Sequence, residues 1–220
     1  MINFSLRHLS FALIIWLTMP FSAALQPPQI LQIYGEALKP GTEAAYQEVE
    51  VDTARLCAEF RCPHPYLAIE TLTGPKEVWF LNGYESSDEQ KQVVDDYAKN
   101  GSLMAALQQN SRRKAALTRT LLNVFANYRQ DLSHGVPWII GHRRFLVITV
   151  IRSGPRIDGT VFEAADGTRF IFRAVQTRRE ADALAEITGQ KSRVFAVRPA
   201  WSFPAEEWVV ADPAFWRPMR

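Results

Sequence analysis

Apolar and polar residues follow two different periods between residues 30 and 129, and each period predicts one kind of element. Short segments rich in β-branched and aromatic residues predict strands at residues 30–36, 66–72, 77–84 and 121–128. Apolar residues at steps of three and four predict a helix between Thr42, its N-cap, and Phe60. A second, interrupted helix over residues 87–117 follows the capping box of Ser86 and Glu89. The order βαββαβ predicts a ferredoxin-like unit.

Alternation along each strand divides its side chains between two faces of the sheet. The more apolar set is expected to face the helices: Leu31, Ile33, Leu67, Ile69, Trp79, Leu81, Leu122 and Val124. The opposite set mixes aromatic rings with amides and carboxylates: Gln32, Tyr34, Glu36, Tyr66, Glu70, Phe80, Asn82, Tyr84, Asn123, Phe125 and Asn127. A face so rich in aromatic residues should be covered, and a second sheet with a polar-lined cavity between the two would cover it.

The second half of the chain predicts fewer elements in a related order. Strands are expected at residues 144–152, 160–164, 168–175 and 192–198. Thr177 and Glu180 form a capping box for one helix before the last strand. This is the first unit without its first helix, which predicts a degenerate second ferredoxin-like repeat; an unrelated β-rich appendage is the alternative. The aromatic tail over residues 201–220 is expected to pack in a groove, with a lid as the alternative.

The fold class is therefore α+β. The predicted boundaries are a signal peptide at residues 1–24, a ferredoxin-like domain at 25–130, a linker at 131–143 and a β-rich half at 144–220. The repeat would cover the open sheet face within one chain, or a homodimer would cover it.

The pattern of strands and helices resembles the dimeric α/β-barrel superfamily, which contains the antibiotic-biosynthesis-type monooxygenases and the NIPSNAP-like proteins. The resemblance covers about residues 29–129 and rests on the strand order, on LKPGTEAAYQEVE and on WFLNGYESSDEQ. It implies two sheets packed face to face, with small molecules bound in the enclosed cavity of several members. The haem-degrading branch uses an Asn, a Trp and a His, whereas residues 87–117 contain no His and no Trp. No haem or other cofactor is therefore expected.

Residues 1–24 have the layout of a secretory signal peptide rather than of a membrane anchor. Arg7 and His8 give a basic start, and the apolar run over residues 11–19 is shorter than the roughly 18 residues that a membrane span needs. We expect an exported protein, periplasmic or secreted, that begins near Leu25 and has no membrane contact after cleavage.

The charge of the chain is nearly balanced, with 25 Lys and Arg against 23 Asp and Glu. Loss of Arg7 with the signal peptide lowers the formal net charge from +2 to +1. Such a balance offers no basic field for nucleic acid, and none is expected as a partner.

Two cysteines, Cys57 and Cys62, could form a disulfide if the helix ends near Phe60 and the chain folds back; two buried free thiols are the alternative. His64 lies close by, but the spacing typical of zinc sites is missing, and no metal site is expected.

The candidate site is the polar set on the presumed cavity face. Glu70 or Glu36 could act as a base if burial raised its pKa. The proposed ligand-binding residues are Tyr34, Tyr66, Phe80, Asn82, Tyr84, Asn123, Phe125 and Asn127. Small-molecule binding is the first functional hypothesis. A cofactor-independent oxygenase or isomerase that acts on a small aromatic or carbonyl compound is the second, and a structural envelope protein is the third.

Overall fold

The computed structural model describes residues 26–135, 137–153, 157–188 and 192–216. The predicted signal peptide lies outside these residues. The strands are β1 (Ile30–Leu38), β2 (Leu67–Thr71), β3 (Glu77–Tyr84), β4 (Thr118–Tyr128), β5 (Phe145–Ile151), β6 (Thr160–Ala164), β7 (Arg169–Val175) and β8 (Ser192–Val197). The helices are α1 (Glu43–Phe60), α2 (Ser87–Lys99), α3 (Gly101–Ala115), α4 (Arg178–Thr188), α5 (Glu206–Ala211) and α6 (Pro213–Trp216), with 3-10 turns η1 (Ile140–His142) and η2 (Pro199–Trp201).

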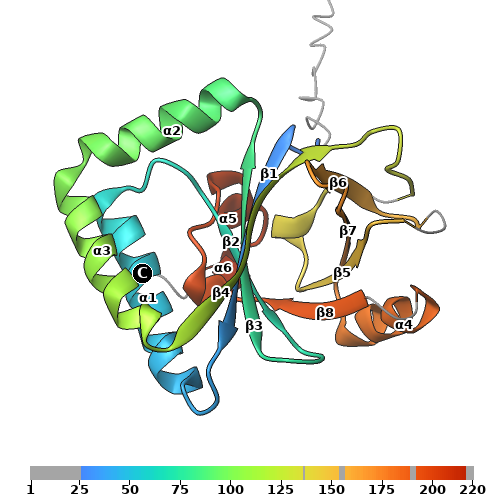
Figure 1. Ribbon diagram of the computed structural model, residues 1–220, viewed down its shortest axis with the longest axis horizontal. Coiled ribbons are helices and arrows are strands. Elements are labelled where there is room, and N and C mark those ends of the chain that lie inside the picture. Colours follow the sequence, from blue (N-terminus) through green and yellow to red (C-terminus); the bar gives the residue numbers. More distant parts are fainter. Residues whose placement is uncertain (1–25, 136, 154–156, 189–191, 217–220) are drawn as a thin grey trace, which may run out of the picture.

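The eight strands close into one antiparallel barrel in the order β1-β3-β2-β8-β5-β7-β6-β4 (Figure 1). The first half of the chain contributes β4-β1-β3-β2 and the second half contributes β8-β5-β7-β6, so the relative strand order is the same in both halves. The halves join where β2 pairs with β8 and where β4 pairs with β6. Strands from both halves of one chain therefore complete the barrel.

The barrel interior is filled with apolar side chains from both halves. Leu31, Ile33 and Trp79 of the first half pack with Ile148, Phe172 and Phe195 of the second, and each is at most 2% exposed. All eight residues that were expected to face the helices lie in or against this interior cluster. The two faces were thus divided correctly, but their assignment was wrong. An eight-stranded barrel is only wide enough for its own side chains, so the purely apolar face turns inward.

The aromatic and polar face of the first half turns outward, beneath the helices. Tyr66 and Phe80 pack with Tyr46 of α1, Leu103 of α3 and other side chains in a separate cluster. Figure 1 shows α1, α2 and α3 on one side of the barrel and α4 on the opposite side. The presumed cavity between two sheets is therefore replaced by an apolar core, and the polar face meets helices instead.

Local signals set most boundaries. Ser86 caps α2 by accepting the Glu89 amide proton, and Thr177 and Glu180 bond each other reciprocally before α4. Thr42 does not cap α1: its hydroxyl donates to the Lys39 and Leu117 carbonyl oxygens instead. No described helix has the length and apolar character that crossing a membrane requires.

The described part of the C-terminal tail, residues 201–216, packs against one end of the barrel; residues 217–220 lie outside the described residues. Trp216 is 3% exposed and donates its indole proton to the Gly141 carbonyl oxygen (3.2 Å). Trp208 lies so close to Gly141 that a Cβ atom at that position would clash with the indole. Arg144 pairs with Asp212 and lies 3.6 Å from the centre of the Phe215 ring. The tail is therefore part of the folded domain.

Candidate functional site

A cavity of about 230 Å³ lies between the outer face of the first-half sheet and helices α1 and α3. It is lined by Gln32 and Tyr34 of β1, Glu50 and Thr53 of α1, Tyr66, Phe80 and Asn82 of the β2–β3 region, and Lys114 of α3. We call it the helix–sheet pocket. The rings of Tyr34 and Tyr66 lie 6.2 and 6.0 Å from the ring of Phe80, and together they form an aromatic wall.

A buried group of charges forms the polar wall of the helix–sheet pocket. Lys114 Nζ lies 3.1 Å from Glu50 Oε1 and 3.2 Å from Glu36 Oε2. Glu36 also accepts hydrogen bonds from the Tyr46 hydroxyl (2.8 Å) and the Tyr34 hydroxyl (2.9 Å). The ammonium group sits 5.0 Å from the Phe80 ring centre, within the range of a cation–π contact. One partly buried cation therefore faces two buried carboxyl groups and an aromatic ring.

Because one ammonium group faces two carboxyl groups, the pKa values of Glu50 and Lys114 are shifted. Burial, partly offset by Lys114 and reinforced by Glu36, raises the pKa of the Glu50 carboxyl. Burial alone would disfavour the Lys114 ammonium, but Glu50 and Glu36 outweigh it and raise the pKa of Lys114. Lys114 therefore stays charged, while Glu50 binds a proton more readily than an ordinary carboxylate. A carboxyl whose pKa is raised in this way accepts protons more readily and is suited to act as a base.

Tyr66 carries the only tyrosine hydroxyl among the described residues that is buried without a hydrogen-bond partner. Its pKa lies well above the ordinary value because of burial and the nearby Glu50, so the hydroxyl is neutral and able to donate. A two-way backbone pairing with Phe203 holds Tyr66 in place, with N···O distances of 2.8 and 3.1 Å. Since buried polar groups are nearly always paired, this hydroxyl is a vacant donor at the pocket wall.

Secondary structure explains why these side chains meet. Tyr34 and Glu36 are two positions apart on β1 and share its outer face. Glu50 lies four residues after Tyr46, on the buried stripe of α1. Lys114 sits in the last turn of α3, where a cation is favourable.

A disulfide joins Cys57 of α1 to Cys62, with the two Cα atoms 4.6 Å apart. Arg61, which lies between the end of α1 and Cys62, adopts a left-handed conformation (φ 53°). This conformation turns the chain back after Phe60. The cross-link fixes the short segment that leads to Tyr66.

The structure gathers four of the predicted ligand-binding residues, Tyr34, Tyr66, Phe80 and Asn82, around the helix–sheet pocket. Glu36, a predicted base, lies directly behind them and bonds to Tyr34. These five residues share one site, although it lies outside the barrel and not in its interior.

The other predicted residues lie elsewhere. Glu70 pairs with Arg198 and, at 3.7 Å, with Lys76. Tyr84 stacks on His64 with ring centres 4.6 Å apart. The remaining three residues lie on β4. Asn123 accepts a hydrogen bond from the Gln32 amide, and Phe125 and Asn127 are exposed.

Glu50 and Lys114 are the site residues that sequence reasoning missed. The available signal was a glutamate on the buried stripe of α1, since a carboxylate there needs a partner. Its partner could not be identified, because Lys114 is 64 positions away and the contact depends on how α1 packs against α3. No cluster of three or more His, Cys, Asp or Glu suited to a metal ion occurs within the described ranges.

Comparison with known proteins supports the fold but not a family. No protein-family model matches the chain, and no curated protein matches its sequence. Its structure is similar to that of a provisionally named monooxygenase from Fusobacterium nucleatum subsp. nucleatum, with a TM-score of 0.50, 12% identity, and coverage of 78% of this chain and 93% of the other.

Two further solved structures have TM-scores below 0.5. One is a provisionally named chlorite dismutase (TM-score 0.47, 7% identity, 78% and 95% coverage). The other is a provisionally named monooxygenase from Lactobacillus acidophilus (TM-score 0.46, 6% identity, 76% and 93% coverage). Of the three, the Fusobacterium structure alone reaches a TM-score of 0.50, and its similarity to this chain extends to the overall fold.

Proposed function

We propose that this protein binds a small, neutral aromatic or carbonyl compound in the helix–sheet pocket. The observation that carries the proposal is the buried Tyr66 hydroxyl, which has no partner and faces a cavity with an aromatic wall. Leaving such a donor unpaired costs about 1–3 kcal/mol, and a bound oxygen atom would recover this cost.

The pocket restricts the class of ligand by size. Its volume of about 230 Å³ is below the roughly 300–1,000 Å³ of pockets for drug-sized ligands, which favours a single ring. Phe80 and Tyr34 offer the ring faces on which such a ligand would pack.

The pocket also restricts the ligand by charge. Lys114 already faces two carboxyl groups, so it has no charge to spare for an anion. Tyr66 donates one hydrogen bond, and the amides of Gln32 and Asn82 can both donate and accept. A neutral phenol, quinol or ketone fits these groups best.

Catalysis in the same pocket is the second candidate function, and the raised pKa of Glu50 favours it. The Glu50 carboxylate would take a proton from a ligand hydroxyl or from a carbon next to a carbonyl. The electron pair left on the ligand would become an oxyanion beside the Tyr66 hydroxyl. Protonation of Glu50 in the same step would leave Lys114 facing the Glu36 carboxylate alone, so that its charge becomes available to the oxyanion. If Glu50 returned the proton to a different atom of the ligand, the protein would be an isomerase. In an oxygenase, dissolved oxygen would instead add to the carbon of the anion, and the resulting hydroperoxide would lose water by cleavage of its O–O bond. A CH2 group would thereby become a carbonyl group that keeps one oxygen atom, a monooxygenase outcome, the activity named for the Fusobacterium protein of similar fold.

Calorimetric titration with 4-hydroxybenzaldehyde tests binding. The wild-type protein should bind the probe, Tyr66→Phe should weaken binding about tenfold for the lost hydrogen bond, and Tyr128→Phe on the barrel interior is the matched control. Equal affinity in wild type and Tyr66→Phe would refute the proposed site, and so would an absence of binding at millimolar probe.

Oxygen uptake with hydroquinone, and proton exchange of a ketone probe followed by NMR, separate an enzyme from a binding protein. An enzyme should lose turnover in Glu50→Gln while keeping affinity for the probe. Binding without either reaction selects the binding protein. The apolar barrel core would equally suit a structural protein, so the case for a ligand rests on the outer pocket alone.

We also propose that the protein is exported and that its barrel closes without a second chain. The signal-like layout of residues 1–24 and the Cys57–Cys62 disulfide support export, because disulfides persist in oxidising compartments. The common strand order of the two halves supports a degenerate ferredoxin-like repeat in place of a dimer partner. Native mass spectrometry of the exported protein tests export and closure within one chain together. It should show a monomer with the mass expected for a chain that begins near Leu25.

A further inference from the structure

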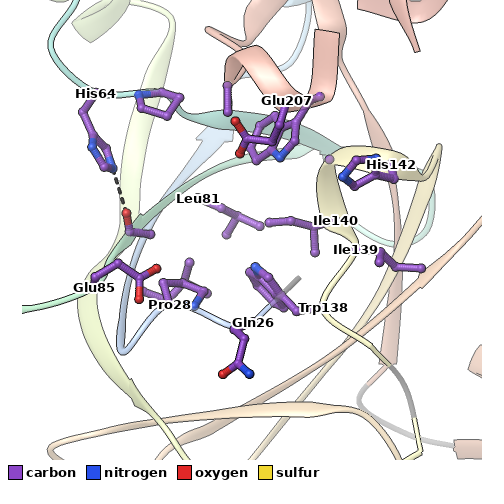
Figure 2. Close-up of a pocket in the computed structure, with 16 residues that line it drawn as sticks. Gln26, Pro28, His64, Leu81, Glu85, Trp138, Ile139, Ile140, His142 and Glu207 are labelled. Carbon is purple, nitrogen blue, oxygen red and sulfur yellow. Dashed lines mark hydrogen bonds between the residues drawn. The ribbon is translucent and has the colours of Figure 1, made fainter. Parts of the chain in front are cut away.

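A second cavity, of about 180 Å³, opens at the end of the barrel that the C-terminal tail covers (Figure 2). We call it the barrel-mouth pocket. Its apolar part includes Leu31 and Leu81, whose side chains belong to the barrel interior, and Ile140 of η1. In the view of Figure 2, Leu81 and Ile140 lie between Glu207 on one side and Trp138 on the other.

The charged groups around the barrel-mouth pocket have one sign. Its sixteen lining residues include the carboxylates Glu85, before α2, and Glu207, on α5, and they include no lysine or arginine. Burial, followed by the negative charge of the neighbouring Glu89, raises the pKa of Glu85. Because no lysine or arginine lines the pocket, its carboxylates leave an excess of negative charge there. A ligand that brings a positive charge would relieve this excess.

His64, one of two histidines at the pocket, does not supply that charge. His64 donates its Nε2 proton to the Gly83 carbonyl oxygen (2.8 Å), the bond drawn in Figure 2. Burial lowers the pKa of His64, so the ring is neutral and its Nδ1 accepts hydrogen bonds. The Nε2 atom of His142 is buried without a hydrogen-bond partner among the described residues. His64 therefore adds a hydrogen-bond acceptor and no positive charge to the pocket.

Two indole rings complete the lining, those of Trp138 and Trp208. Aromatic faces beside carboxylates are the chemistry that recognises organic ammonium ions, because the ring quadrupole and the carboxylates both attract a cation. The apolar floor at Leu31 and Leu81 suits a short alkyl or aryl group attached to the ammonium.

We propose that the barrel-mouth pocket is a second binding site, specific for a small organic amine in its ammonium form. The carboxylates of Glu85 and Glu207 attract the ammonium group to the pocket, and the apolar part of the ligand reaches toward Leu81. This site is separate from the helix–sheet pocket, which favours neutral ligands.

Titration calorimetry at low salt with benzylammonium, benzyl alcohol and benzoate tests the inference. Benzylammonium should bind most tightly and benzoate least, and added salt should weaken benzylammonium binding. Glu85→Gln combined with Glu207→Gln should weaken it about tenfold, since each exposed carboxylate contributes a modest attraction. Glu206→Gln, the neighbouring residue on α5 outside the lining, is the matched control and should change nothing.

Three outcomes would overturn the inference: no benzylammonium binding at millimolar concentration, equal binding of benzoate, or unchanged affinity in the double variant. Both substitutions are at exposed positions, so the variant should remain folded. Tyr66→Phe should leave benzylammonium affinity unchanged, which distinguishes this site from the helix–sheet pocket.

Discussion

Replacing Tyr66 by phenylalanine removes one oxygen atom from a buried position and leaves the ring against Phe80. The wild-type hydroxyl has no hydrogen-bond partner, so its removal abolishes a desolvation cost of about 1–3 kcal/mol. We therefore expect Tyr66→Phe to increase the free energy of unfolding by at least about 1 kcal/mol. For a domain of this size, each kcal/mol corresponds to a rise in Tm of about 2–4 °C.

Tyr46→Phe is the matched comparison within the same cluster. The Tyr46 hydroxyl donates to Glu36 at 2.8 Å in a fully buried setting. Its loss leaves a buried carboxylate oxygen less well paired and should lower the free energy of unfolding by about 1.5–3 kcal/mol. The same chemical change should thus have opposite effects at two tyrosines on one cluster.

Urea unfolding and thermal melts of the two variants measure these differences. A drop in stability of 1 kcal/mol or more for Tyr66→Phe would refute the reasoning, because it would mean that the hydroxyl already has a partner in the folded protein. Ligand binding gives an independent readout: a variant that is more stable and binds less well is the signature of a residue kept for function.

Three further changes test the charge cluster, the barrel mouth and the filled interior. Because the pKa of the Glu50 carboxyl is raised in the folded state, its stabilising contribution is complete below about pH 4.3 and is lost as the pH rises through the folded-state pKa. In urea unfolding, the stability of Glu50→Gln relative to wild type should therefore increase as the pH rises above about 4.3; a relative stability that falls with pH would contradict this. Gly141→Ala should displace Trp208 and lower stability by about 1–3 kcal/mol in thermal melts, and an unchanged Tm would contradict the close contact. Phe172→Ala should cost about 3–5 kcal/mol in urea unfolding, against under about 1 kcal/mol for the exposed Phe125→Ala; similar costs would exclude a packed interior.

The strands and helices could be predicted from local patterns because their signals are local. The strand Glu77–Tyr84 and the hairpin strand Thr160–Ala164 have the predicted bounds, and the capping residues Ser86 and Thr177 mark helix starts. Strand alternation also separated the two faces of the sheet.

The direction of each face could not be predicted, because it depends on how the second half closes the barrel. Leu31 and Trp79 face inward only because Phe172 and Phe195 of the second half meet them there. The same closure moved the predicted site from the interior to the helix side. Tyr34, Phe80 and Asn82 stayed together because β1 and β3 pair there, with Tyr34 opposite Phe80 and Asn82 two positions further along β3. Glu70 instead pairs with Arg198.

The most direct test of the central claim is an NMR titration of the ¹⁵N-labelled protein with 4-hydroxybenzaldehyde. The side-chain amides of Gln32 and Asn82 report on the helix–sheet pocket, and the Trp79 indole proton, which bonds to Glu77, reports on the barrel interior. Saturable shifts of the two amides with an unchanged Trp79 signal are the predicted result. A shifted Trp79 signal with unchanged amides, or no shift at millimolar probe, would contradict a ligand site on the outer face.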